Sequence, residues 1–367
     1  MKTWIALLAT VTLAVPSCKK KTDTGAPAGG GAEPAGSGAP AGSGAGVATP
    51  KSAGPVTLNG TGSTFQKQFQ EASIEGFTKV NADIKVNYGG GGSGKGRQDF
   101  ADRVTDYGCS DGLYKDDEKA KVKGGEFLYV PVLLGAITVS YNLDGVDKLQ
   151  LSSEVIAKIF ERDIKKWNDP AIAADNPGVK LPATDIVVAH RSDGSGTTAQ
   201  FTLYLDSAAT GTWKLKNGST VEWPSDTQAG NGNAGVAQIV KNTKGAIGYV
   251  DLPDAKASGL RYASIKNQAG KYVEPTSESA KAAGDGIEVK ADLTYVSVNA
   301  KGDASYPITA PTWCMVYTKA GPKAEALKSY FKFMITDGQQ LVPGIDFAPL
   351  PKSLQDKAIA AVDKISG

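Results

Sequence analysis

Histidine and cysteine are scarce in this chain, which has one histidine and three cysteines in 367 residues. The usual transition-metal sites need clusters of histidine, cysteine and carboxylate ligands at short spacing. His190 has no second histidine to join it, and no Cys-x-x-Cys pair occurs. The sequence therefore predicts no bound metal and no cofactor.

Charge of one sign is not in excess either, since the formal net charge is +2 and charged residues make up 21% of the chain. No polybasic surface is expected, so we predict that the chain binds no nucleic acid. Any preference for an anion must then come from a local site. A chain of 367 residues is too long for one ordinary core, and two lobes are expected once the N-terminal segment is set aside.

Long apolar runs are missing beyond the N-terminus. Residues 1–17 have the features of a signal peptide: Lys2, an apolar stretch from Trp4 to Val15, and then Val15-Pro-Ser-Cys18. The run Val15-Pro-Ser-Cys18 resembles a lipobox, which implies cleavage before Cys18 and a diacylglyceryl thioether on its sulfur. Ordinary secretory cleavage with an incidental cysteine is the alternative. The first interpretation makes the chain an exported lipoprotein, anchored to a cell-envelope membrane in the periplasm or at the cell surface.

Residues 18–54 consist almost wholly of Gly, Ala, Pro, Ser and Thr, with Val47 as the only large aliphatic residue. Such a segment cannot bury a core, so we expect a lipid anchor and flexible linker before a folded body that begins near residue 55. Two cysteines remain in that body, Cys109 and Cys314, in runs that are typical of strands. Export permits a disulfide between them, and two buried thiols are the alternative.

Glycine is plentiful, and three glycine-rich turns each lie between an apolar run and a helical pattern. They read Leu58-Asn-Gly-Thr-Gly-Ser-Thr-Phe65, Tyr88-Gly-Gly-Gly-Gly-Ser-Gly-Lys-Gly96 and Arg191-Ser-Asp-Gly-Ser-Gly-Thr-Thr198. Backbone N–H groups and hydroxyls at such turns converge on small anions, and the helix dipole adds to the attraction. Three such turns with one arginine among them predict a cage for a compact tetrahedral oxyanion.

Short apolar runs alternate with helical patterns from Val56 onward, which favours an α/β architecture with mainly parallel sheets. Strands are expected at 56–58, 84–88, 127–132, 137–141, 186–189 and 246–250. Helices are expected over 65–80 with Ser63 or Thr64 as N-cap, from Ser93 with Phe100 and Val104 turned inward, from Ser195, and at 155–160 and 324–333. Ligands of open α/β sheets lie beyond the carboxyl ends of the strands, where all three turns fall.

Together with Gly108-Cys-Ser-Asp111, these turns resemble the phosphate-binding protein family of bacterial phosphate-specific ABC transporters. The resemblance extends over about residues 55–355, and the run from Arg191 to Thr197 is its most specific piece. It implies a type II periplasmic-binding-protein fold, with two α/β lobes joined by two hinge crossovers and the ligand in the cleft. Residues 55–135 and 311–367 would form lobe 1, and residues 136–310 would form lobe 2.

The resemblance also implies a phosphate shell, in which Asp193 holds the Arg191 guanidinium and Phe65 and Gly196 act through their N–H groups. The shell consists of Thr64, Phe65, Ser93, Asp111, Arg191, Ser195, Gly196 and Thr197. Asp111 is an anion facing an anion, which makes sense if it accepts the proton that phosphate keeps at neutral pH and that sulfate lacks. A site built around one required hydrogen bond can discriminate by roughly 10⁴–10⁵. Lys95 and Arg97 are expected to be solvated charges.

The function implied is that of an extracytoplasmic solute-binding protein, a monomer and not an enzyme. It would capture inorganic phosphate and deliver it to the membrane permease and ATPase subunits of the transporter. A phosphate-ester hydrolase is one alternative, but it needs a nucleophile with a base or a two-metal site, and a single histidine weighs against it. A binder of another tetrahedral oxyanion such as sulfate is the other, and it would give Asp111 no proton to accept.

Overall fold

The computed structural model describes residues 55–367, so the predictions for residues 1–54, including lipidation of Cys18, lie outside the described residues. The strands are β1 (Val56–Gly62), β2 (Ile84–Gly90), β3 (Tyr107–Ser110), β4 (Phe127–Tyr141), β5 (Gln150–Leu151), β6 (Val187–Arg191), β7 (Gln228–Gly230), β8 (Ala246–Asp251), β9 (Arg261–Tyr262), β10 (Ser264–Lys266), β11 (Tyr272–Val273) and β12 (Thr309–Tyr317). The helices are α1 (Lys67–Val80), α2 (Ser93–Ala101), α3 (Asp116–Lys119), α4 (Ser153–Phe160), α5 (Pro170–Asp175), α6 (Gly196–Ala208), α7 (Gly232–Asn242), α8 (Leu252–Ala257), α9 (Ser277–Gly284), α10 (Ala324–Ile335) and α11 (Lys352–Val362).

Most strands join one mixed sheet in the order β2-β1-β3-β12-β4-β8-β6-β7, with β9 beside β4. β1 is parallel to β2 and β3, and β6 is parallel to β7 and β8. β12 and β4 run antiparallel to each other and to their outer neighbours, so the expectation of mainly parallel sheets is wrong. A continuous apolar run is typical of any strand buried on both faces, and it does not reveal the direction of pairing.

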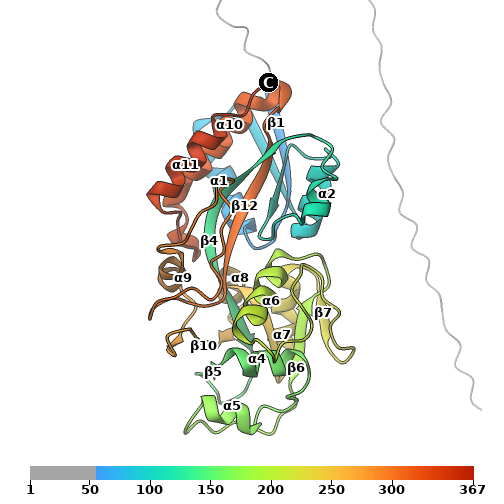
Figure 1. Cartoon of the computed structure of the whole chain (residues 1–367), viewed down its shortest axis with the longest axis vertical. Coiled ribbons are helices and arrows are strands. Elements are labelled where there is room, and N and C mark those ends of the chain that lie inside the picture. Colours follow the sequence, from blue (N-terminus) through green and yellow to red (C-terminus); the bar gives the residue numbers. More distant parts are fainter. Residues whose placement is uncertain (1–54) are drawn as a thin grey trace, which may run out of the picture. The chain divides into compact units, whose positions relative to one another are not determined.

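β4 is one continuous strand of 15 residues where the sequence predicts two, and it is buried from Tyr129 to its end. Its first part pairs with β12 from Phe127 to Ala136, and its last part pairs with β8 from Ile137 to Tyr141. Figure 1 shows β4 and β12 running side by side through the middle of the described unit. β4 therefore belongs to both halves of the sheet.

The pairing of β4 with β12 contains an irregularity that the sequence explains. Thr312 lies opposite Leu133 while Trp313 lies opposite Pro131, so that Val132 is an extra residue. Proline has no N–H to give to a ladder, and in sheets it is confined to edges and bulges. Gln339 donates its Nε2–H to the carbonyl of Val132 at 2.8 Å, which gives the extra residue a partner.

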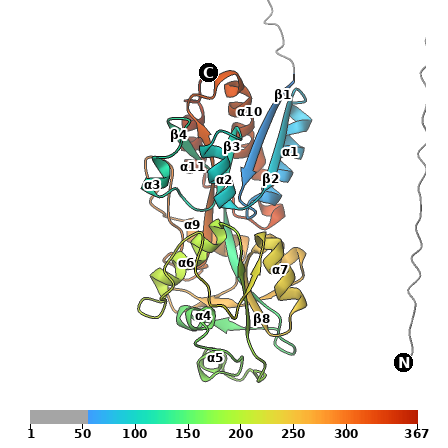
Figure 2. The same ribbon diagram turned by 90° about the vertical axis from the view of Figure 1, so that its right-hand side faces the viewer.

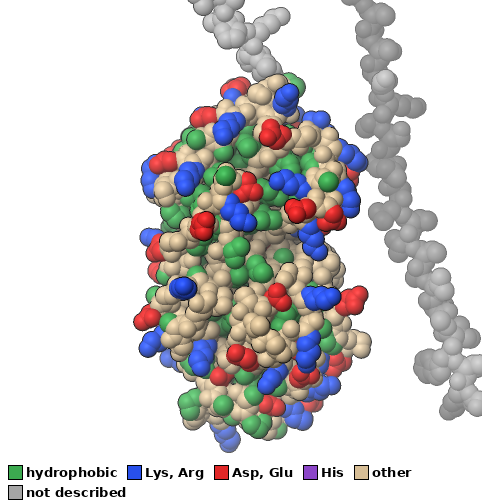
Figure 3. Space-filling view, viewed as in Figure 1, with side chains coloured by type: hydrophobic (Ala, Val, Ile, Leu, Met, Phe, Trp, Pro, Cys, Tyr) green, Lys and Arg blue, Asp and Glu red, His purple; other side chains and the backbone are tan. Residues whose placement is uncertain are grey.

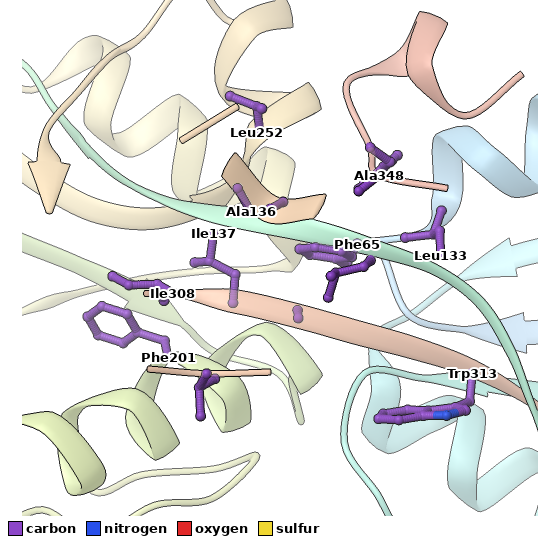
Figure 4. Close-up of a cluster of buried hydrophobic side chains, with 14 of the residues drawn as sticks. Phe65, Leu133, Ala136, Ile137, Phe201, Leu252, Ile308, Trp313 and Ala348 are labelled. Carbon is purple, nitrogen blue, oxygen red and sulfur yellow. The ribbon is translucent and has the colours of Figure 1, made fainter. Parts of the chain in front are cut away.

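Helices cover the two halves of the sheet separately. α1, α2 and α10 lie around β1, β2 and β3, whereas α6, α7 and α8 lie around β6 and β8 (Figures 1 and 2). One hydrophobic cluster nevertheless extends through both halves. Figure 4 shows Phe65, Ile137, Ile308 and Trp313 in this cluster, along β4 and β12.

Two details of the predicted helices are wrong. α2 ends at Ala101, so Val104 falls beyond the helix and is 68% exposed instead of turned inward. α1 has Gln66 at its N-cap position, with no side-chain cap. The hydroxyl of Ser63 donates to Asp111 at 2.6 Å, and its oxygen accepts from the N–H of Phe65 at 3.0 Å, two residues before the helix begins.

The surface carries charges of both signs. On the face drawn in Figure 3, Lys and Arg side chains are interspersed with Asp and Glu, in keeping with a net charge of +2. Among residues 55–367, no helix combines the length and the apolar composition that crossing a bilayer requires.

Candidate anion-binding site

The three glycine-rich turns lie at the carboxyl ends of strands, as predicted: β1 leads into α1, β2 into α2 and β6 into α6. Backbone hydrogen bonds join them to one another. The N–H groups of Gly91 and Gly92 both donate to the Gly62 carbonyl at 2.9 Å, and the N–H of Gly94 donates to the Gly194 carbonyl at 2.7 Å. The structure thus brings together three segments that are far apart in the sequence.

Asp111 directly follows β3 and is 1% exposed. Two hydroxyls donate to its Oδ1, from Ser63 at 2.6 Å and from Thr312 at 2.7 Å. Its Oδ2 has one long contact, with the Ser93 hydroxyl at 3.4 Å. Burial raises the pKa of Asp111 above the ordinary carboxyl value, although these hydrogen bonds and the charge of Arg191 act in the opposite direction. The carboxyl group is therefore held by one oxygen, and the other is available as an acceptor.

Arg191 ends β6, and its side chain is 1% exposed. Its Nε donates to Asp193 Oδ1 at 2.7 Å, its Nη2 donates to Asp193 Oδ2, and its Nη1 lies 3.4 Å from Thr197 Oγ1. Burial acts to raise the pKa of Asp193, but the hydrogen bonds and charge of Arg191 outweigh it and hold that pKa below the ordinary value. The N–H of Gly232 adds a bond to Asp193 Oδ1 at 3.0 Å. Because both Nε and Nη2 of Arg191 donate to Asp193, the orientation of the guanidinium is fixed.

The start of α6 packs directly onto the Asp111 carboxyl group. Ser195 is the N-cap, and its Oγ accepts from the N–H of Thr198 at 3.0 Å. A Cβ placed on Gly196 would lie 2.4 Å from Ser93 Oγ and 2.6 Å from Asp111 Oδ2, which is closer than real atoms approach. Only glycine lets the helix N-terminus and the carboxyl group come together.

Thr64 and Phe65 occupy the first turn in different ways. The Phe65 ring is buried against Phe347, with ring centroids 5.4 Å apart, and its N–H donates to Ser63 Oγ at 3.0 Å. Thr64 Oγ1 accepts from the side-chain Nδ2 of Asn233 at 3.1 Å. Since the Phe65 side chain belongs to the core, only its backbone can take part in binding.

The predicted residues therefore lie on turns that meet at one place, and three further residues there were not predicted. The sequence predicts Ser63 as a helix cap only, and Thr312 reaches Asp111 from 201 positions away, with no motif in its own segment to indicate the contact. Asn233 carried a usable signal, because Gly230-Asn-Gly-Asn233 is a fourth glycine-rich turn between β7 and α7.

The prediction for Arg97 is wrong. Its side chain is 9% exposed, and its guanidinium donates to Ser110 Oγ at 3.2 Å and to Ser219 Oγ at 3.3 Å. Lys95 behaves as predicted, as a half-exposed charge beside Asp99 at 2.8 Å. The two differ because they project from different faces of α2, which a short glycine-rich helix does not reveal in its sequence.

His190, the single histidine, packs beside the candidate site. Its ring stacks on Trp223 with centroids 5.1 Å apart, its Nδ1 lies 3.0 Å from the Arg191 carbonyl, and burial lowers its pKa. Within residues 55–367, no group of three or more His, Cys, Asp or Glu residues is arranged to hold a metal ion.

The two cysteines face each other across neighbouring strands. Cys109 of β3 lies opposite Cys314 of β12, both are fully buried, and their sulfurs are 2.8 Å apart as thiols.

Comparison with known proteins identifies the family of this chain. A family model described as a PBP superfamily domain matches residues 39–338. The phosphate-binding protein PstS of Methanocaldococcus jannaschii is 38% identical over 84% of this chain and 86% of its own length, and that of Pasteurella multocida is 37% identical over 82% and 88%. The solved phosphate-binding protein from Stenotrophomonas maltophilia shares the fold, with a TM-score of 0.62 at 20% identity over 83% of this chain and 93% of its own. The chain belongs to the PstS family within the PBP superfamily.

Proposed function

We propose that this member of the PstS family is an extracytoplasmic solute-binding protein that captures inorganic phosphate for import by an ABC transporter. The observation that carries the proposal is the Asp111 carboxyl group, buried at the meeting point of three glycine-rich turns with one oxygen held by two hydroxyls. A buried acceptor among donors fits an anion that brings its own proton.

The donors of the proposed shell carry little charge. The N–H groups of Gly196 and of Phe65, which donates to Ser63 Oγ in this structure and would turn to the anion, contribute partial positive charge together with the helix N-termini. Arg191 supplies the single full cation. The remaining donors are the hydroxyls of Thr64, Ser93, Ser195 and Thr197. Such a shell suits a compact oxyanion that stays tightly but reversibly bound, with Asp193 keeping the guanidinium in place.

Asp111 is proposed to set the selectivity. Its Oδ2 would accept the hydrogen of hydrogenphosphate or dihydrogenphosphate, whereas a sulfate oxygen in the same position would face a carboxylate with no hydrogen between them. Loss of one required hydrogen bond in a buried site separates otherwise similar ligands by roughly 10⁴–10⁵.

The proposal includes the larger arrangement of the chain. Residues 55–135 with 311–367 form one lobe and residues 136–310 form the other, and the lobes close on phosphate by bending at β4 and β12. A lipid on Cys18 and a linker over 18–54 tether the monomer to a cell-envelope membrane. From there it hands phosphate to the permease and ATPase subunits, and it catalyses no reaction.

Calorimetry on the chain, unfolded and refolded to strip bound anion, tests the proposal. We expect one phosphate per chain, at least about a thousandfold weaker binding of sulfate, and no sustained release from a chromogenic phosphate ester. Similar affinity for the two anions would refute the role of Asp111, and turnover of the ester by pure protein would refute the proposed function itself.

A further inference from the structure

A fourth strand-to-helix turn contributes a side chain to the candidate site. Asn233 is the second residue of α7, its side chain is fully buried, and Gly232 before it has a φ of 68° that favours glycine. Its side-chain Nδ2 lies 3.1 Å from Thr64 Oγ1 and 3.3 Å from Thr197 Oγ1. One amide thus joins two hydroxyls from different turns.

Two N–H groups of Asn233 are directed at the hydroxyl oxygen of Thr64. Besides the side-chain Nδ2, the backbone N–H of Asn233 points to Thr64 Oγ1 at 3.4 Å. A hydroxyl has one proton to donate and two lone pairs to accept with. With two donors already directed at its oxygen, Thr64 is favoured to offer its proton elsewhere.

The hydroxyl of Thr197 is in the same position. It receives the second Nδ2 proton of Asn233 at 3.3 Å, and Arg191 Nη1 lies 3.4 Å away on another side. Each threonine oxygen therefore has two N–H groups directed at it, at 3.1 to 3.4 Å, which favours turning the proton of the hydroxyl away from them.

We propose that Asn233 is a positioning residue that turns the hydroxyl protons of Thr64 and Thr197 toward the bound anion. This inference rests on the proposed function, and it adds a residue outside the phosphate shell itself. Without the amide, each hydroxyl can rotate and present a lone pair to the anion, which repels it. The remaining amide oxygen, Oδ1, is buried without a partner among the described residues, so burying the Asn233 side chain carries a desolvation cost.

The orientation of the amide is what the experiment must probe. If Oδ1 faced the two threonines instead, it would accept both hydroxyl protons and withdraw them from the anion. Three variants separate these cases. Asn233→Asp keeps the shape but only accepts while ionised, Asn233→Leu keeps most of the volume without polarity, and Asn231→Asp is a control that adds the same charge at an exposed position of the same turn.

Phosphate affinity of each stripped protein is measured by calorimetry from neutral pH down toward pH 4, relative to the unsubstituted chain. We expect Asn233→Asp to bind at least about a hundredfold more weakly at neutral pH, and Asn233→Leu about tenfold more weakly. Asn231→Asp is expected to stay within about threefold, because its charge is exposed and screened. Asp111, Arg191, Asp193, Asp251 and Asp254 are the charged groups of the surrounding elements. Asn233→Leu keeps all of them and adds no charge, so its ratio to the parent shows how much of the pH dependence comes from these groups alone.

The pH profile distinguishes positioning from mere packing. As pH falls, the introduced carboxyl group gains a proton that it can donate, so the deficit of Asn233→Asp should shrink while that of Asn233→Leu stays constant. A constant deficit in both variants, or binding by Asn233→Leu as tight as in the parent, overturns the inference. If Asn233→Asp does not fold, Asn233→Leu still tests the inference, because phosphate binding as tight as in the parent overturns it. Failure of the parent chain to bind phosphate would instead mean that the proposed function is wrong.

Discussion

Replacing Asp111 with asparagine changes one atom of the candidate site from an acceptor to a donor. The hydroxyls of Ser63 and Thr312 both donate to Oδ1, so the amide oxygen should take that place and keep both bonds. The amide nitrogen then replaces Oδ2, which has only the long contact with Ser93 at 3.4 Å. The substitution therefore leaves the support of the side chain intact and inverts what it offers to the anion.

The expected effect has opposite signs for the two anions. Phosphate loses a hydrogen bond to a charged group, worth about 1.5–3 kcal/mol, which corresponds to roughly 10- to 150-fold weaker binding. Sulfate loses the repulsion of a buried carboxylate and gains a donor, so its affinity should rise. The ratio of the two affinities is expected to fall by at least about a hundredfold.

Calorimetry of Asp111→Asn with both anions measures that ratio, after stripping by unfolding and refolding. Thr312→Val is the matched comparison, because it removes one bond to Oδ1 and leaves Oδ2 in place. It should weaken phosphate binding by roughly tenfold while the preference over sulfate persists. If Asp111→Asn instead keeps the parent preference for phosphate, selection by the proton of the anion is refuted.

Three further outcomes are expected. Gly196→Ala should weaken phosphate binding by roughly 5- to 150-fold, since forcing in a methyl group costs about 1–3 kcal/mol, whereas Gly344→Ala, with open space around it, should leave calorimetric affinity unchanged. Burial raises the pKa of Asp251 well above its ordinary value, and the charge of Asp254 adds to this shift. The folded state therefore loses stability as pH rises through that raised pKa. Asp251→Asn should unfold at a higher temperature than the parent at neutral pH, and this difference in unfolding temperature should vanish below the ordinary carboxyl range. Mass-resolved thiol labelling should modify neither Cys109 nor Cys314 before denaturation and both afterwards, and a 109–314 disulfide in the purified protein would contradict this.

The glycine-rich turns could be located from the sequence because their chemistry is local. Glycine and hydroxyl residues mark a strand-to-helix junction whatever surrounds it, and Ser93 and Ser195 indeed lie where such junctions were expected. The family resemblance then indicated Asp111 as a candidate site residue, because the residues around it in the sequence do not show what it contacts. Its burial and its raised pKa depend on the fold and could not be predicted from its neighbours.

The residues that were missed depend on how distant segments meet. Thr312 donates to a carboxylate 201 positions away, and Arg97 donates to Ser219, which lies 122 positions further on. Neither contact leaves a periodic trace in the sequence. The direction of β4 was missed for a related reason, since an apolar strand fits parallel and antiparallel neighbours equally.

The extra residue in β4 lies next to the hydroxyl that supports Asp111. Thr312 is paired with Leu133, directly beside Val132, where the ladder between the two long strands is interrupted. At a bulge the ladder is locally disrupted and the bulged strand bends. Flexing of the two strands there would shift the Thr312 hydroxyl relative to Oδ1. Opening of the proposed lobes would in this way loosen the bond that holds the carboxyl group proposed to select the anion.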